Sequence, residues 1–129
     1  MNSESHLLAD LKRESAFFRH ILFLGLECSN LYDFQIELST RFSVVMKQLG
    51  IEKQELMLFL LERGYIDLFV QSGRTGPTIK WDMIDPGAWV HVLHDEGAWL
   101  PRLREEASYE IGITDLGRRV LNELDQAES

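Results

Sequence analysis

The sequence predicts a single α+β domain in which several helices pack with a small antiparallel sheet. Apolar residues recur at helical spacing through the first half of the chain. A β-branched and aromatic run at 65–70 is followed by a cluster rich in Gly and Pro, which is typical of a β-hairpin. The length of 129 residues suits one domain, and 45% hydrophobic with 26% charged residues is an ordinary globular composition.

The first helix is expected over residues 5–27. Leu7, Leu11 and Phe18 fall largely at helical steps, and from Ala16 onward the segment is apolar on nearly every side. A helix with this pattern is expected at the centre of the core or in the seam of a homodimer.

A second helix is expected over residues 31–49, where six apolar residues recur at steps of three and four: Leu31, Phe34, Leu38, Phe42, Val45 and Leu49. Asn30 is the predicted N-cap of this helix, and Gly50 is the glycine expected just beyond its C-terminus.

A third helix is expected over residues 52–63, ending at Gly64. The hairpin follows, with a strand at 65–70, a turn at 72–77 and a returning strand at 78–81.

Another helix is expected over residues 85–96. Asp85 is its predicted N-cap, Pro86 suits the first helical position, and Gly97 marks its end.

A short strand at 109–113 and a final helix to about Leu124 complete the expected elements. The hydroxyl of Thr114 is expected to cap this helix. Gly117 is expected to let the helix approach a neighbouring strand closely, despite the cost of about 1 kcal/mol for glycine in a helix.

Two segments carry a likeness to a known family. Residues 60–66, LLERGYI, resemble the end of a recognition helix passing into a wing strand, and residues 113–121, ITDLGRRVL, resemble the last wing strand entering the final helix. The chain thus resembles the winged-helix superfamily of helix-turn-helix domains. The resemblance implies a winged-helix-like three-helix core with a small antiparallel sheet and a C-terminal helix, residues 52–63 at the recognition-helix position, and 81–109 as an insertion with its own helix.

The net charge of -8 is unevenly distributed. Residues 1–80 hold 10 acids against 9 bases, whereas residues 81–129 hold 11 acids against 4 bases. The acid excess argues against generic binding to nucleic acid or anionic membranes. The near-neutral first part leaves DNA binding open, and a basic partner is expected at the second part.

The insertion carries all three tryptophans beside several acids. Trp89 is expected to pack on the domain, and Trp81 and Trp99 are expected to face solvent. Aromatic rings beside carboxylates suit a cationic protein partner. The first hypothesis is therefore a small interaction or regulatory module whose partner-binding surface holds five residues: Trp81, Asp82, Asp95, Glu96 and Trp99.

The alternative hypothesis is a DNA-binding transcriptional regulator, dimeric through the first helix at 5–27. It would use the helix at 52–63 and the wing at 72–80, and its contacts would come from four residues: Lys53, Gln54, Arg74 and Lys80. Three carboxylates against two cations on that helix oppose phosphate binding.

No motif predicts catalysis or a cofactor. His91 and His94 lie three residues apart, a spacing that could place both rings on one helix face for a metal, but no third ligand is indicated. A solvated polar face is the expected reading of this pair. Cys28 is expected as a buried structural residue at a helix end. From these patterns together, no enzyme, metal or cofactor is predicted.

A cytoplasmic protein without a membrane segment is expected. The single cysteine excludes an internal disulfide and fits a reducing compartment. The apolar stretch at 16–26 is too short to span a bilayer and is interrupted by Arg19 and His20. Glu4 and Asp10 stand before it, where a secretory signal carries positive charge.

Overall fold

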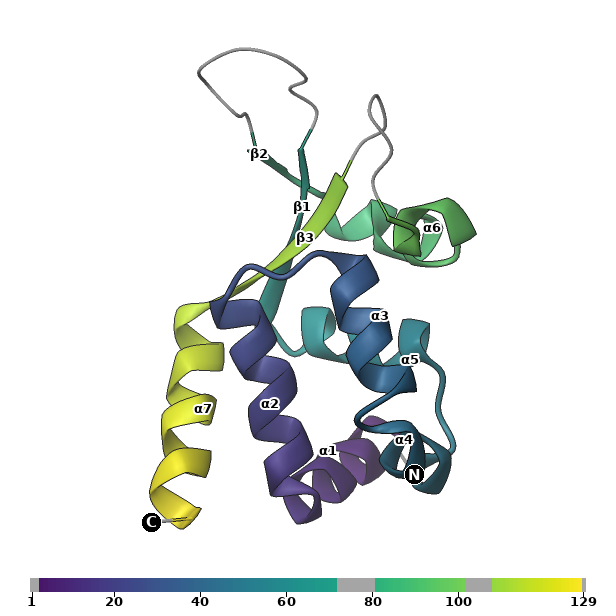
Figure 1. Ribbon diagram of the computed structural model, residues 1–129. Coiled ribbons are helices and arrows are strands. Elements are labelled where there is room, and N and C mark those ends of the chain that lie inside the picture. Colours follow the sequence, from purple (N-terminus) through teal and green to yellow (C-terminus); the bar gives the residue numbers. More distant parts are fainter. Residues whose placement is uncertain (1–2, 72–80, 102–107, 129) are drawn as a thin grey trace.

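Seven α-helices, two short 3-10 helices and three strands make up the parts of the chain that the computed structural model describes, residues 3–71, 81–101 and 108–128 (Figure 1). Their order is α1 (Ser3–Arg13), α2 (Ser15–Leu26), α3 (Leu31–Ser39), α4 (Ser43–Leu49), α5 (Lys53–Glu62), β1 (Ile66–Gln71), β2 (Trp81–Met83), η1 (Pro86–Ala88), α6 (Trp89–Leu93), η2 (Glu96–Trp99), β3 (Ser108–Ile113) and α7 (Asp115–Glu128). The α+β class is confirmed. Within the described ranges, no helix has the length and apolar character needed to cross a bilayer.

The three strands form one antiparallel sheet in the order β2-β1-β3. Alternate residues face opposite sides of a strand, and Ile66, Leu68 and Ile111 are fully buried on the side that faces the helices. The predicted hairpin pairing is confirmed for β1 with β2, which begins at Trp81. The rest of the expected returning strand, at 78–80, lies outside the described residues.

Helix α2 is the centre of the core, as expected from its apolar second half. Phe17, Phe18, Ile21 and Leu22 are each at most 2% exposed. The helix packs against β3 and α7 (Figure 1), and a β-carbon on Gly25 would lie 3.2 Å from the Ile66 side chain. The dimer seam through this segment stays a prediction.

The expectation of one continuous helix over residues 5–27 is wrong. The chain breaks at Glu14, whose φ of -96° and ψ of 59° are not helical. The break lets Leu11 of α1 and Phe17 of α2 both enter the core, where they are 0% and 2% exposed. Because residues on both sides of Glu14 are buried in the same core, a bend at Glu14 is favoured over one straight helix.

The helix expected over residues 31–49 is also two helices, α3 and α4. The Thr40 hydroxyl donates to the Ile36 carbonyl oxygen at 2.6 Å, which ends α3. The following turn brings the Phe42 ring to 4.9 Å from the Phe17 ring, edge to face. This aromatic contact in the core favours the break over a longer helix.

Three of the predicted helix ends, at Asn30, Gly50 and Gly64, are accurate. The backbone N–H of Asp33 donates to Asn30 Oδ1 at 2.7 Å, which confirms the N-cap of α3. Gly50 and Gly64 follow α4 and α5 with φ of 66° and 76°, the left-handed conformation that glycine adopts most readily.

The helix expected over residues 85–96 is wrong in length and in its cap. The chain forms η1, the five-residue α6 and η2 instead, and the Asp85 side chain makes no capping hydrogen bond. Helix α6 ends at Leu93, whose carbonyl oxygen accepts a 2.8 Å hydrogen bond from the Trp99 indole N–H. The Gly97 N–H donates to Asp95 Oδ1 at 3.0 Å and starts the next turn.

Candidate functional site

The outer side of the sheet carries aromatic, apolar and acidic side chains. The register pairs Phe69 of β1 with Met83 of β2 and with Glu110 of β3. These residues alternate with the buried ones, so they lie on the side opposite the helices. We call this surface the sheet face and define it by five residues: Asp67, Phe69, Trp81, Met83 and Glu110.

Two large apolar side chains of the sheet face are open to solvent. Trp81 is 40% exposed and Met83 is 63% exposed, both on β2 at the edge of the sheet. The Phe69 ring lies against Gly112, where an added β-carbon would be 3.0 Å from the ring. Exposed aromatic area of this kind is enriched where proteins bind one another.

Glu110 places a carboxylate at the β3 edge of this surface, across the sheet from Trp81 and Met83. It is half-buried on β3, and its backbone forms an isolated bridge with Asn30 beyond the sheet edge. Burial raises the pKa of the Glu110 carboxyl above its ordinary value, because an ionised carboxylate loses hydration there. A cation bound beside this carboxylate would offset the cost of its burial.

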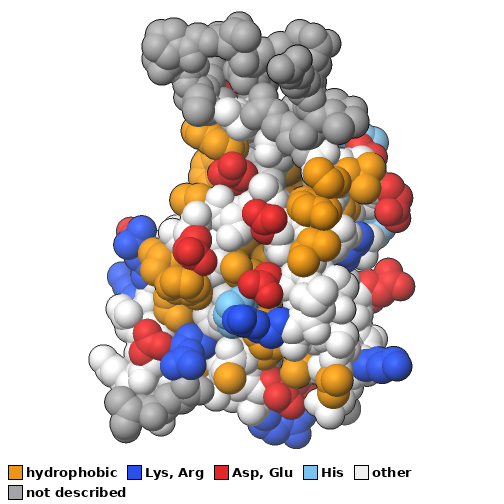
Figure 2. Space-filling view, viewed as in Figure 1, with side chains coloured by type: hydrophobic (Ala, Val, Ile, Leu, Met, Phe, Trp, Pro, Cys, Tyr) orange, Lys and Arg blue, Asp and Glu red, His pale blue; other side chains and the backbone are white. Residues whose placement is uncertain are grey.

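Glu110 also lines a hollow of about 450 Å³ between β3 and the facing ends of α2 and α3. Its other acids are Glu27, Asp33 and Glu37, and we call this hollow the acidic pocket. Figure 2 shows acidic side chains running down this side of the molecule, from the sheet to α2 and α3. The shared Glu110 makes the sheet face and the acidic pocket one continuous surface.

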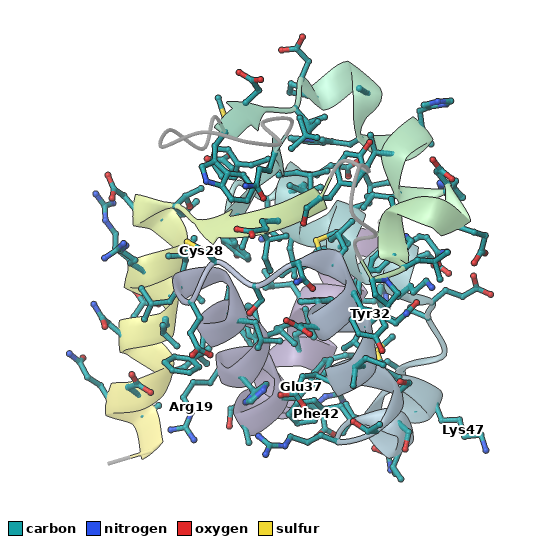
Figure 3. The ribbon with its side chains drawn as sticks, turned by 45° about the horizontal axis from the view of Figure 1, so that its top comes forward. Arg19, Cys28, Tyr32, Glu37, Phe42 and Lys47 are labelled. Atoms are coloured by element: carbon teal, nitrogen blue, oxygen red, sulfur yellow. The ribbon has the colours of Figure 1, made fainter. Side chains whose placement is uncertain are left out.

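Within the described ranges, one of the pocket acids lies at ion-pair distance from basic side chains. Glu37 lies on α3 (Figure 3). Its carboxylate is 3.4 Å from His20 Nε2 and 4.0 Å from Arg41 Nε. Glu27 and Asp33 are exposed at the mouth of the pocket. The acidic pocket therefore keeps an excess of negative charge.

The aromatic end of this surface is predictable from the sequence, but the acidic end is not among the predicted residues. Trp81 faces solvent as expected, and Asp82 is exposed beside it on β2. The sequence does contain a signal for Glu110, because it is a lone acid in a strand of alternating pattern. It also stands two positions from Gly112, a glycine that Phe69 of the neighbouring strand can cover. The acids on α3 and in the α2–α3 connection gave no sequence signal, because only the tertiary fold brings them to β3.

The prediction that Trp99 faces solvent is wrong, because the side chain is 1% exposed. Its indole N–H is satisfied by Leu93, so burial leaves no unpaired donor. The Asp95 carboxylate accepts a hydrogen bond from the Gly97 N–H at the start of η2. Glu96 lines a separate groove beside α5. The five predicted partner residues are therefore not one surface.

Two residues expected to contact DNA line that same groove. The Lys53 ammonium lies 4.8 Å from the centre of the Trp99 ring and hydrogen-bonds Gln35 Oε1. Gln54 follows it in the groove lining. Arg74 and Lys80, the two wing residues, lie outside the described residues.

The remaining candidates show no assembled chemical site. His91 and His94 are exposed, and a His94 ring nitrogen lies 2.9 Å from the Val90 carbonyl oxygen. No three potential metal ligands converge among the residues described.

Cys28 follows the end of α2 as expected, but it is exposed rather than buried, with a φ of 55° (Figure 3). Trp89 is half-buried as expected from a packing role.

None of the protein-family models, curated proteins and solved structures compared with the chain matches it.

Proposed function

We propose that this chain is a small interaction or regulatory module that binds a positively charged protein partner on the sheet face and the acidic pocket. The observation that carries the proposal is the continuity of the two through Glu110. Exposed apolar side chains lie at one end of the surface, and the carboxylates of the acidic pocket lie at the other.

The chemistry of this surface favours arginine and lysine. A guanidinium or ammonium group gains free energy over the face of an indole or phenyl ring, and Trp81 and Phe69 supply such rings. Glu110, Glu27 and Asp33 offer carboxylates to the same partner. Complementary charge also speeds the encounter and excludes anionic partners.

A winged-helix-like scaffold remains part of this proposal, with residues 81–109 as an insertion before the last strand. It is supported by α5 leading directly into β1 and by β3 leading into α7 through Thr114. A cytoplasmic location also remains proposed, and the unpaired Cys28 is consistent with it.

The DNA-binding alternative has weaker support. Lys53 lies half-buried in the groove, against Trp99 and Gln35, and does not stand on an exposed face of α5. Glu52 and Glu55 form a capping box there, which places two carboxylates where a phosphate would approach. The helix at 52–63 therefore favours a protein partner over DNA.

A pull-down with matched variants tests the proposal. Trp81→Ala and Glu110→Gln should each lose a partner that the unaltered chain retains, and added salt should weaken the same partner. Val44→Ala is the control, because Val44 is 67% exposed on α4, outside the proposed surface. Retention in both surface variants would contradict the proposal. Salt-sensitive gel shifts with duplex DNA would instead support the alternative.

A further inference from the structure

A groove of about 720 Å³ lies between α3, α4, the start of α5 and η2, separate from the proposed interaction surface. Its apolar part is formed by Leu38, Met46 and Ile51. The groove is in the size range of small-molecule sites, which is about 300–1,000 Å³. A compact organic ligand therefore fits it better than an extended protein segment.

Lys53 is the positioned charge of this groove. Its ammonium lies 4.8 Å from the centre of the buried Trp99 ring and hydrogen-bonds Gln35 Oε1. Gln35 in turn donates from Nε2 to the Trp99 carbonyl oxygen at 3.2 Å. These contacts orient the side chain, so little further ordering is needed when an anion binds.

Within the described ranges, the Lys53 ammonium has no carboxylate at ion-pair distance. The Glu52 carboxylate accepts from the backbone N–H of Glu55 in the capping box at the start of α5. Lys47, the other lysine of the lining, extends outward from α4 (Figure 3). Lys53 is therefore a half-buried, oriented cation beside an apolar wall, with no anionic partner among the described residues.

We propose that this groove binds a small carboxylate with an apolar body, the carboxylate on Lys53 and the body against Leu38, Met46 and Ile51. A charge-assisted hydrogen bond to the ammonium supplies specificity for the anion. Burial of the apolar body supplies most of the affinity.

Glu96 gives the proposal an additional test, because it lines the groove and is exposed. Its negative charge repels a carboxylate ligand, so Glu96→Gln should bind the ligand more tightly. A cationic or neutral ligand would show the opposite effect or none.

Calorimetric titration of the full chain tests the proposal with three probes of one chain length: octanoate, octanol and octylammonium. The unaltered chain should bind octanoate more tightly than octanol, and octylammonium most weakly. Lys53→Met should weaken octanoate binding about tenfold or more, the usual size of a hydrogen bond to a charged group, and leave octanol unchanged.

Two variants keep the result interpretable. Lys53→Arg retains the positive charge and should retain the preference for octanoate, while Lys12→Met, at an exposed position of α1 outside the groove, should leave octanoate binding unchanged. Unaltered circular dichroism establishes that each variant is folded. Equal octanoate affinity in Lys53→Met and in the unaltered chain, or no octanoate binding at millimolar concentration, would overturn the proposal.

Discussion

The α-carbon of Gly117 lies against the backbone of Tyr65. A β-carbon built on Gly117 would be 2.1 Å from the Tyr65 carbonyl oxygen and 2.8 Å from Ile113 Cγ1. The first turn of α7 therefore sits directly on the chain as it enters β1, and only glycine allows that approach. The Tyr65 carbonyl oxygen also accepts a 3.0 Å hydrogen bond from the Thr114 N–H, which joins the start of α7 to the start of β1.

Gly117→Ala should destabilise the fold by about 1–3 kcal/mol or more, because backbone atoms must move to admit the methyl group. Chemical denaturation measures the loss. Gly87→Ala is the control: nothing lies within 4 Å of its added β-carbon. Equal stability of the two variants would contradict the close contact.

Thr114→Val should cost about 1 kcal/mol of stability, the usual value of a lost N-cap. The Thr114 hydroxyl accepts from the Gly117 N–H at 3.0 Å and donates to the Gly64 carbonyl oxygen at 2.5 Å. Thr114→Ser keeps the hydroxyl and should lose much less. If both substitutions have the same effect in urea unfolding, the hydroxyl does not act as the cap.

Trp99→Phe should destabilise the chain by about 1–3 kcal/mol, because the Leu93 carbonyl oxygen loses its donor inside the fold. Trp81→Phe changes the same side chain at a 40% exposed position and should have little effect on stability. Thermal unfolding of the two variants compares them. A Trp99→Phe variant as stable as Trp81→Phe would show that the indole hydrogen bond contributes nothing.

The stability of Glu110→Gln should depend on pH in a defined direction. Burial raises the pKa of Glu110 in the folded chain, so the folded state holds this proton more tightly than the unfolded state. The unaltered chain therefore loses stability as the pH rises from the ordinary carboxyl pKa through the raised pKa. Glu110→Gln should be the more stable protein near neutral pH, and the difference should vanish below the ordinary carboxyl pKa.

Urea unfolding at neutral and acidic pH measures that difference, with Glu123→Gln, at an exposed position of α7, as the control. A Glu110→Gln chain less stable than the unaltered protein near neutral pH would show that the carboxylate is held by favourable contacts rather than penalised by burial.

Much of the fold follows from local patterns in the sequence. The helical spacing, the caps at Asn30 and Thr114 and the glycines after α4 and α5 are short-range effects, and the structure confirms them. The breaks at Glu14 and before Phe42 were missed, because they depend on where Phe17 and Phe42 meet in the core. Such tertiary contacts override a continuous helical period.

The candidate site could be predicted from the sequence only in part, for the same reason. Trp81 could be singled out as an exposed aromatic residue, but the same argument failed for Trp99, whose indole found a carbonyl partner six residues back. The acidic pocket joins α2, α3 and β3, which are far apart in sequence. Its charge is visible only once the chain is folded.

Site-specific photo-crosslinking tests the central proposal most directly. With p-benzoylphenylalanine in place of Met83, which is 63% exposed on the sheet face, irradiation in cells that produce the chain should yield a covalent protein adduct. The same group at Val44, 67% exposed on α4, should not yield it, and Asp67→Lys should abolish the adduct at position 83. No adduct at position 83, an equal adduct at position 44, or an adduct that survives Asp67→Lys would contradict the proposed partner surface.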